Sequence, residues 1–533
     1  MPRVLLNTAS GRLRSKAEQA SAFEYLPVFN ELVSSTTTRI DYVRIKREVR
    51  LYFRYVMLSH RWEDNEPLFQ QVIHKVVYEL DSSPTHDKLK TFCQIVRDAG
   101  ISWAWSDTCC VDKSDHFVLQ EALVAMFKWY QGSTMMIVFL RGVRPSRRGA
   151  LVKSIWNTRA WTLQEYVAAS VIRFYTEDWT LYLDLELPNH KVSPEIISEM
   201  EQATGVSAQQ LMSLRPGLNN IREKLRLAST RQTTLVEDAA YSLLGIFSVS
   251  GIPAIYGEGE SSLGRLLAHV LAGSGDVSIL AWTGESGGFN SCLPAHITVF
   301  KGPATSHLPR PVPDVEMRRI ITSRSSSFDL EAALALYDRL NELSAPWFAA
   351  SRMKLPCIIF QLPTLSPYRT RSGYVFRADT VEFGVVEIKT RQDLSRMKSF
   401  YLVHPWLDAL LEREDIQNDA FLEDEILQPP SPDMGDEELV DEEMDVRSIR
   451  SSLFPKPLSP LPAHVQTAPV DRETGARRLV ARLRQPFGAL LLKLVSTGRR
   501  YSRVAADDLI TVRIQDNVSL SNILGNVQTI DVL

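Results

Sequence analysis

Strand-like and helix-like segments alternate over the first 185 residues, and this alternation limits the fold more than any other feature of the sequence. Short apolar runs suited to buried strands lie at Phe53–Ser59, Ile101–Cys110, Met135–Leu140 and Val171–Tyr175. Apolar residues at helical spacing separate these runs, at Leu68–Leu80, Leu89–Val96, Leu119–Tyr130 and around Trp161 and Glu165. Parallel strands need long crossover connections, which are usually helices. The alternation therefore predicts a doubly wound α/β domain with a parallel sheet.

The remainder of the chain divides by composition. We expect an N-terminal extension at 1–50, the α/β domain at 51–185, a helical region at 186–275, a β-rich region with a Pro-containing connector at 276–405, an insertion at 406–470 and C-terminal strands at 471–533. Asp419–Asp445 is acidic and Ser451–Pro469 is rich in proline, so the insertion is predicted to be disordered. An isolated strand pair is marginal in water, so residues 472–515 should pack with the strands of 356–402.

Charge and cysteine content exclude several classes of protein. The net charge of −3 argues against general nucleic-acid binding. Five cysteines, an odd and sparse set, do not form a disulfide framework and suit a reducing compartment. The N-terminus lacks the apolar core of a signal peptide, and no apolar run approaches the roughly 18 residues of a membrane span. We therefore expect a soluble cytoplasmic protein.

The segment from Ser154 to Glu165 places two tryptophans, an arginine and a carboxylate at the start of a predicted helix. Trp161 and Glu165 are four residues apart, so they share a helix face. An aromatic wall beside a carboxylate can recognise a flat or cationic ligand. A structural tryptophan beside a solvated glutamate is the competing interpretation.

Polar side chains also follow two of the predicted strands. Tyr55–Trp62 ends in Ser59, His60, Arg61 and Trp62, which could bind the phosphate or ribose of a nucleotide. Trp105–Lys113 ends in a similar way and includes Asp107. Ligands of such sheets sit beyond the carboxyl ends of the strands, where we place Ser59 and Asp107. The competing interpretation is a packed strand end whose polar side chains merely face water.

The adjacent cysteines of the second strand end allow two further hypotheses. Cys109 and Cys110 lack another Cys/His pair at ligand spacing, so we predict no metal site. A nucleophilic cysteine paired with His60 or His116 stays open as an alternative. Ser59 lies outside a G-x-S-x-G elbow, which argues against a serine hydrolase.

Four blocks of this chain resemble, in the same order, the HET (heterokaryon incompatibility) domain proteins of filamentous fungi. The blocks are Tyr55–Trp62, Trp105–Lys113, Trp156–Glu165 and Val236–Phe247, and the later Tyr256–Glu260 and Ser278–Trp282 are also similar to that family. The resemblance covers roughly residues 50 to 300. The family usually has glycine where this chain has Glu63, a difference that bears on the shape of the local loop, and Val111 and Lys113 also depart from its pattern. The resemblance implies a cytosolic effector that triggers death of incompatible fused cells.

HET domains are in turn similar to TIR domains, which implies a flavodoxin-like sheet and, in some members, cleavage of NAD. The TIR pattern resembles Ser154 or Trp156, then Trp161, then Glu165. The resemblance implies that Glu165 is catalytic and stabilises oxocarbenium-like charge, as carboxylates do in glycoside hydrolysis. Trp161 would stack on nicotinamide, and Ser59, Arg61, Trp62 and Asp107 would line the pocket. NAD is then a candidate substrate, and no cofactor is required.

A second hypothesis from a different class is a non-catalytic module that signals by self-association. A third, a regulator of transcription or secondary metabolism, rests only on the acidic segment. No fused oligomerisation module or repeat array is recognisable, so we expect the recognition partner to be a separate protein, in addition to self-association.

Overall fold

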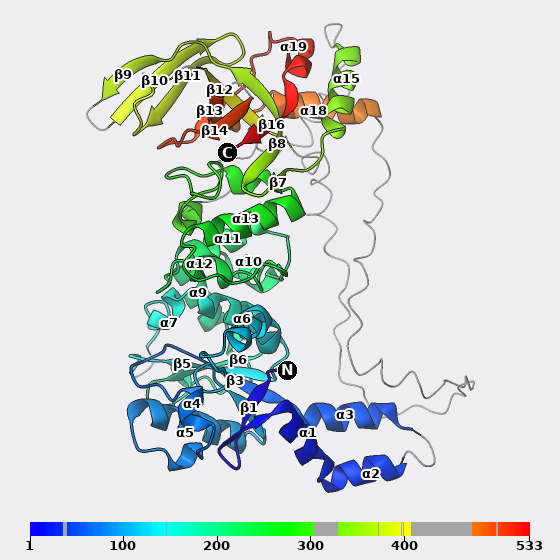
Figure 1. Ribbon diagram of the computed structural model, residues 1–533, viewed down its shortest axis with the longest axis vertical. Coiled ribbons are helices and arrows are strands. Elements are labelled where there is room, and N and C mark those ends of the chain that lie inside the picture. Colours follow the sequence, from blue (N-terminus) through cyan, green and yellow to red (C-terminus); the bar gives the residue numbers. More distant parts are fainter. Residues whose placement is uncertain are drawn as a thin grey trace.

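The computed structural model describes residues 1–35, 40–144, 147–302, 329–370, 373–395, 397, 399–406, 472–496 and 499–533. It is elongated, with an α/β sheet domain at one end, a helical region in the middle and a β region at the other end (Figure 1). The predicted connector at Pro309–Pro313 and the predicted insertion lie outside the described residues, except for Trp406. Trp406 is 2% exposed, and its backbone N–H donates to the Pro356 carbonyl at 3.0 Å, so this residue packs with the β region.

A six-stranded sheet forms the core of the N-terminal domain, in the order β2-β1-β4-β3-β5-β6. Its strands are β1 (Val4–Asn7), β2 (Arg12–Ser15), β3 (Tyr55–His60), β4 (Trp103–Trp105), β5 (Met135–Leu140) and β6 (Ile172–Thr176). The strands β4, β3, β5 and β6 run parallel, and every residue of β3 is buried. A strand buried on both faces reads as a continuous apolar run, which is why sequence patterns locate β3 and β5.

The sheet differs from the expected parallel one at its edge. Residues counted as an N-terminal extension form the hairpin β1–β2, and β1 pairs antiparallel with β4. The sheet is therefore mixed. A run as short as Val4–Asn7 carries little periodicity, and its pairing with β2 on one side and with β4 on the other makes it a strand.

Helices cover both faces of this sheet, with α5 on one side and α6 on the other (Figure 1). The helices are α1 (Lys16–Glu24), α2 (Pro27–Ser35), α3 (Tyr42–Tyr52), α4 (Phe69–Val72), α5 (Pro84–Asp98), α6 (His116–Gln131), α7 (Ile155–Thr158) and α8 (Trp161–Ala168). The helix expected over Leu68–Leu80 was wrong, because only α4 and the 3-10 turn η1 (Val77–Glu79) form there. The Val77 N–H donates to the Gly11 carbonyl at 2.8 Å, and this tertiary bond replaces a helical one.

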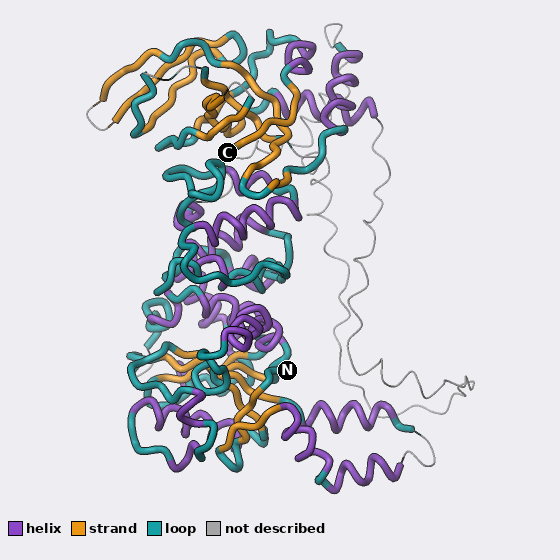
Figure 2. The backbone as a smooth tube through the Cα atoms, in the orientation of Figure 1, coloured by secondary structure: helices purple, strands orange, loops and turns teal. Residues whose placement is uncertain are grey.

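The middle region is helical, as Figure 2 shows. It contains η2 (Tyr182–Asp184), η3 (His190–Val192), α9 (Pro194–Thr204), α10 (Ala208–Ser213), α11 (Ile221–Ser229), α12 (Asp238–Tyr241) and α13 (Ser261–Ser274). Strands expected between Val277 and Phe300 were wrong, because the 3-10 turns η4 (Val277–Leu280) and η5 (Ile297–Lys301) stand there instead. The apolar side chains of this stretch are buried against helices, and such packing needs no sheet partner. None of the helices among the described residues is both long and apolar enough to span a bilayer.

The C-terminal region is rich in strands, and some of them close into a small barrel. Its strands are β7 (Trp347–Ala349), β8 (Arg352–Gln361), β9 (Ser366–Thr370), β10 (Gly373–Thr380), β11 (Gly384–Thr390), β12 (Phe400–Pro405), β13 (Phe487–Ser496), β14 (Arg500–Arg503), β15 (Ile510–Val512) and β16 (Val527–Val532). Strands β12, β13, β14, β16 and β8 pair in sequence, and β12 also pairs with β8, which closes a small barrel. Helices α15 (Leu330–Asn341), α18 (Arg472–Leu483) and α19 (Leu520–Gly525) accompany it. The C-terminal residues thus return to the strands of 347–405 through the pairing of β12 with β13.

Candidate functional site

The carboxyl end of β3 meets the helix α8 at a buried contact between Ser59 and Glu165. The Ser59 hydroxyl donates to Glu165 Oε2, and Trp156 Nε1 donates to Ser59 Oγ at 2.7 Å. Ser59 is 1% exposed and Glu165 is 9% exposed. Glu165 is therefore not the solvated carboxylate of the competing interpretation. Of the two candidates upstream of it, Trp156 reaches this contact, whereas Ser154 caps the N-terminus of α7.

Glu165 titrates close to neutrality because of this environment. Burial, together with the negative charge of Asp107, raises its pKa to about 7 against the opposing effects of the Ser59 hydrogen bond and the Arg159 and Arg231 charges. A carboxyl group with a pKa near the working pH can act as a base or as an anion in catalysis. Perturbed groups of this kind concentrate at functional sites, although structural clusters also contain them.

A buried arginine from the helical region fixes the segment that carries Glu165. Arg231 Nη1 donates to the Arg159 carbonyl at 2.9 Å and to Thr162 Oγ1 at 2.8 Å. The backbone N–H of Gln232 donates to the Thr158 carbonyl at 2.6 Å. Arg159 Nη1 in turn donates to the His60 carbonyl at 2.8 Å. The start of α8 is thus held between the helical region and the end of β3.

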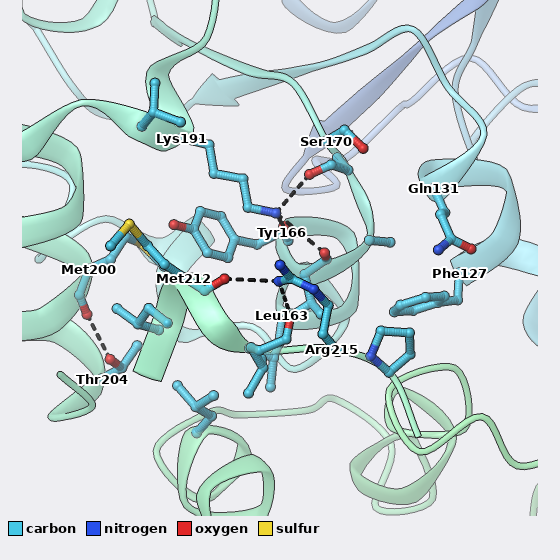
Figure 3. Close-up of a pocket in the computed structure, with 18 of the residues that line it drawn as sticks. Phe127, Gln131, Leu163, Tyr166, Ser170, Lys191, Met200, Thr204, Met212 and Arg215 are labelled. Carbon is cyan, nitrogen blue, oxygen red and sulfur yellow. Dashed lines mark hydrogen bonds between the residues drawn. The ribbon is translucent and has the colours of Figure 1, made fainter. Parts of the chain in front are cut away.

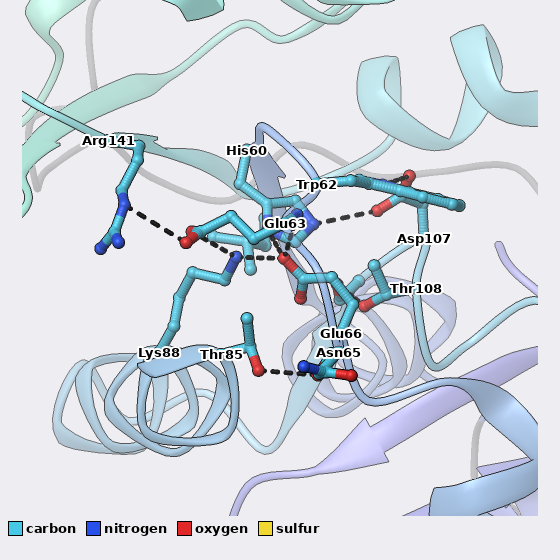
Figure 4. Close-up of polar contacts among 12 residues, drawn as sticks. His60, Trp62, Glu63, Asn65, Glu66, Thr85, Lys88, Asp107, Thr108 and Arg141 are labelled. Atoms are coloured by element: carbon cyan, nitrogen blue, oxygen red, sulfur yellow. Dashed lines mark hydrogen bonds and ion pairs between the residues drawn. The ribbon is translucent and has the colours of Figure 1, made fainter. Parts of the chain in front are cut away.

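A second cluster lies at the adjacent strand end, around Asp107. Because β3 and β4 are hydrogen-bonded neighbours, Ser59 and Asp107 lie at adjacent strand ends, as the sequence predicts. Asp107 Oδ2 accepts from Trp62 Nε1 at 2.7 Å, and Oδ1 lies 3.2 Å from His60 Nε2 (Figure 4). Burial raises the pKa of Asp107, but the His60 hydrogen bond and the Lys113 charge outweigh it and lower the pKa to about 2. The Lys113 ammonium lies 3.1 Å from the centroid of the Trp62 ring.

Buried ion pairs connect His60 to the helix α5. The Lys88 ammonium contacts Glu66 and lies 3.4 Å from Glu63 Oε1, and its side chain is 2% exposed. Arg141 Nε lies 3.2 Å from Glu63 Oε2, on the other side of the carboxylate (Figure 4). His60 Nδ1 is 3.8 Å from Glu66 Oε1, which places the imidazole between two carboxylates. These contacts hold the loop after β3 in one arrangement.

The same contacts account for the glutamate that stands where the resembled family usually has glycine. The Glu63 carboxylate joins Lys88 to Arg141. The left-handed backbone of this loop falls at Asn65, with φ of 63°, and Glu63 is not among the residues with positive φ. Asparagine tolerates that conformation better than most residues. The loop therefore does not need glycine at position 63.

Trp161 lies in a third group, where the later sequence blocks meet α8. The Trp161 side chain donates a hydrogen bond to Asp238. Burial raises the pKa of Asp238, and this hydrogen bond partly offsets that rise. The Tyr256 hydroxyl donates to Asp238 Oδ1 at 3.0 Å. The backbone N–H groups of Gly257 and Gly259, both in the left-handed region, donate to Glu237 Oε1 at 2.8 and 3.0 Å. The blocks that are separate in the sequence therefore converge around α8.

The structure brings together most of the predicted site residues but not all. Ser59 contacts Glu165, Trp62 contacts Asp107, and Trp161 bonds to Asp238 instead. Arg61 is exposed and makes no hydrogen bond or ion pair with other residues that the structure describes. Sequence reasoning missed Lys113 and Arg231 as neighbours of the site. Lys113 ends one of the quoted blocks and could have been chosen, whereas Arg231 stands in no motif.

The environment of the adjacent cysteines disfavours a reactive thiol. Cys109 Sγ and Cys110 Sγ lie 3.9 Å apart and both side chains are buried. The hydrogen bond with Cys110, together with burial, raises the pKa of the Cys109 thiol well above its usual range. The thiolate is the nucleophilic form of cysteine, so this environment disfavours a cysteine nucleophile. No group of three metal-ligating side chains occurs among the described residues.

Comparison with known proteins finds two matches to this chain. Residues 55–148 match the family model "Heterokaryon incompatibility protein (HET)" and include the ends of β3 and β4. The chain is also 35% identical over 229 residues to "Vegetative incompatibility protein HET-E-1" of Podospora anserina. That match covers 40% of this chain and 16% of the relative, so the chain matches about a sixth of that protein's length. Both findings support the HET family. No solved structure matches this chain.

Proposed function

We propose that this chain is a heterokaryon incompatibility effector that triggers cell death on non-self recognition by cleaving NAD. The single observation that carries the catalytic part is the buried contact between Ser59 and Glu165 at the end of a parallel strand. The name of the relative supports the biological role, since it describes a vegetative incompatibility protein.

The strand order supports a TIR-like, flavodoxin-like sheet. Numbered along the chain, the four parallel strands stand in the order second, first, third, fourth. Flavodoxin-like sheets begin with this order and bind ligands at the switch point between the first and third strands. Here that point lies between β3 and β5. Ser59 is the penultimate residue of β3, and Arg141 directly follows β5.

The proposed reaction breaks the bond between the nicotinamide nitrogen and the ribose carbon. The bonding electrons leave with nicotinamide, the ribose carbon gains oxocarbenium-like charge, and water adds to it with release of a proton. An ionised Glu165 would stabilise that positive charge and accept a ribose hydroxyl in place of Ser59. The carboxyl pKa of about 7 leaves a large ionised fraction at neutral pH.

Other residues near the site suit the rest of a dinucleotide. Arg61 and Lys113 are cations beside the strand ends, where a diphosphate would lie. Trp62 is 37% exposed and covers the Lys113 ammonium, so its movement would uncover a cation. Trp161, half-buried at the start of α8, would stack on nicotinamide. Because Glu165 is only 9% exposed, the substrate would reach it after neighbouring side chains move.

Glu165→Gln tests this proposal, because glutamine keeps the size of the side chain and removes its charge. We expect nicotinamide release by the purified chain, followed by chromatography, to fall at least about 100-fold. The matched control is Glu199→Gln. Glu199 is another buried carboxylate that lies away from the site, and it accepts a hydrogen bond of 3.0 Å from the Tyr182 hydroxyl. The control should retain cleavage. In a fungal host, Glu165→Gln should abolish both killing and NAD loss; killing at the wild-type level would refute the catalytic role.

The alternative is a non-catalytic module that self-associates, and one observation favours it. Helices α2 and α3 project from the sheet domain, as Figure 1 shows, and α3 has no buried residue. Tyr25, Val33, Tyr42 and Val43 are more than half exposed on this arm. Exposed apolar groups of this kind mark association surfaces. A protein that oligomerises, kills cells and leaves NAD intact would establish this alternative.

A further inference from the structure

A cavity of about 480 Å³ lies between the sheet domain and the helical region (Figure 3). Its walls come from α6, α8, η3, α9, α10 and α11, and it lies on the other side of α8 from Ser59. Leu163, Met200, Leu211 and Leu227 are buried in its walls, whereas Met212 is exposed at its rim. Protein interiors are close-packed, and voids much larger than a water molecule are few. A cavity of this size falls within the range of small-molecule sites.

The charges of the cavity have one sign. Lys191 and Arg215 are the charged residues among those that line it, and both are basic. They are close enough for the Arg215 charge, added to burial, to lower the pKa of Lys191 to about 8. Two neighbouring cations repel each other, and an anion between them would relieve that repulsion.

Two polar side chains of the lining, those of Lys191 and Asn189, are already hydrogen-bonded within the protein. The Lys191 ammonium donates to the carbonyls of Tyr166 and Ala169, each at 2.8 Å, and so closes the C-terminal end of α8. Asn189 Nδ2 donates to the Ser170 carbonyl at 3.0 Å. These bonds fix the wall of the cavity where α8 ends.

Arg215 and Tyr166 offer donors of the lining to a ligand. Arg215 Nη1 donates to the Met212 carbonyl at 2.9 Å and to the Leu214 carbonyl at 3.2 Å. The other guanidinium nitrogens of Arg215 make no hydrogen bond to the described residues. The Tyr166 hydroxyl makes no hydrogen bond with any residue in the described ranges. Arg215 is exposed at the mouth, while Tyr166 is 4% exposed. A guanidinium with free N–H groups is suited to a carboxylate.

We propose that this cavity binds a small anionic amphiphile, a carboxylate carried on an apolar body. The apolar part would occupy the space between Leu163, Met200 and Leu227, and the carboxylate would meet Arg215 at the mouth. Ligand sites commonly combine an apolar lining with a few placed polar groups in this way. The inference does not depend on NAD cleavage.

The position of the cavity gives the ligand a structural effect. Leu163 and Tyr166 face the cavity from α8, and Glu165 of the same helix faces Ser59. A ligand that binds only the folded arrangement stabilises it by mass action. Occupancy would therefore hold α8 in place and slow amide exchange over Trp161–Ala168.

Three probes of equal chain length test the charge preference: decanoate, decanol and decyltrimethylammonium. Titration calorimetry of the purified full chain should show one decanoate bound, at least about tenfold tighter than the cationic probe. Arg215→Glu should weaken decanoate at least tenfold, strengthen the cationic probe and leave decanol unchanged. Arg148→Glu, an exposed arginine outside the lining, is the matched control and should change none of the three.

Two outcomes would overturn the inference. Equal affinity for the three probes would mean unspecific adsorption to apolar surface. Decanoate binding that survives Arg215→Glu would place the anion elsewhere.

Leu211→Trp fills the cavity. This variant should abolish the binding of every probe, and decanoate should then no longer slow amide exchange in α8. If Leu211→Trp does not fold, Arg215→Glu and Arg148→Glu still test the inference, because both arginines are exposed.

Discussion

The N-terminal sheet and the C-terminal barrel both bury apolar strands, yet their buried polar side chains have different partners. Every residue of β3 is buried, and so is the stretch of β8 from Leu355 to Phe360. The sheet also buries Ser59 with Glu165, and Lys88 with Glu66, at its carboxyl edge. In the barrel a buried imidazole, His404, instead stacks on Phe487 with ring centroids 4.0 Å apart.

Topology explains this difference. Parallel strands all end at one edge of a sheet, so polar residues that follow several strands converge there. A closed barrel pairs its strands all round and keeps an apolar interior. The sheet therefore gathers polar clusters at one edge while the barrel keeps an apolar interior, and the local stability of each region tests this contrast.

The largest expected effect is on the buried ion pairs of the sheet domain. Lys88→Met leaves the buried carboxylate of Glu66 without its cation, and removal of one partner of a buried pair costs about 3–5 kcal/mol. Native-state hydrogen exchange of peptides from β3 and α5 should report the loss, while peptides from the barrel should not change. A loss below about 1 kcal/mol would mean that water screens these charges.

The two regions should respond to pH in opposite directions. The folded-state pKa of Glu165, about 7, lies above its ordinary value of 4.5, so the sheet domain loses stability as pH rises between these values. Burial lowers the pKa of His404 from 6.5 to about 4, so the barrel loses stability as pH falls through that window. Each effect is at most about 3 kcal/mol.

Variants separate the two pH effects. Glu165→Gln should flatten the pH dependence of exchange in α8, and His404→Phe should flatten that of β12. Exchange measured from pH 4 to 8, corrected for intrinsic rates, checks both. A slope in α8 that persists in Glu165→Gln would assign the titration to another group.

An intermediate effect is expected where the helical region meets the sheet domain. A Cβ atom at Gly245 would lie 2.2 Å from Phe127 Cβ, so Gly245→Ala overpacks this contact and should cost about 1–3 kcal/mol. Gly525→Ala, in the C-terminal region, is the matched control because its Cβ would meet nothing within 4 Å. The control should be neutral or slightly stabilising in chemical denaturation.

The smallest effect is expected for an exposed ion pair of the C-terminal region. Arg377 and Glu387 stand opposite each other on β10 and β11, with side chains 59% and 43% exposed. Arg377→Ala should cost only about 0.2–1 kcal/mol, and less at high salt. A cost similar to that of Lys88→Met would break the contrast between buried and exposed pairs.

Sequence patterns predicted the elements whose buried residues form one continuous apolar run or one apolar helix stripe. The runs that became β3 and β5 are apolar on both faces, and α5 has a serine cap, a proline at its first position and an apolar stripe. They failed where a tertiary bond overrides periodicity, as at Val77. They also failed at Val277–Phe300, where aromatic side chains pack on helices without strand pairing.

For the site, sequence order alone placed Ser59, Trp62, Asp107 and Glu165 in blocks of a recognisable family. Strand parallelism follows from the alternation of elements, so the adjacency of Ser59 and Asp107 was predictable. The resemblance placed Ser59 and Glu165 in one pocket, but it did not predict that Glu165 is buried against Ser59 or that Arg231 fixes its helix. Burial and the contacts of Arg231 depend on residues far apart in the chain, and only the tertiary structure brings those residues together.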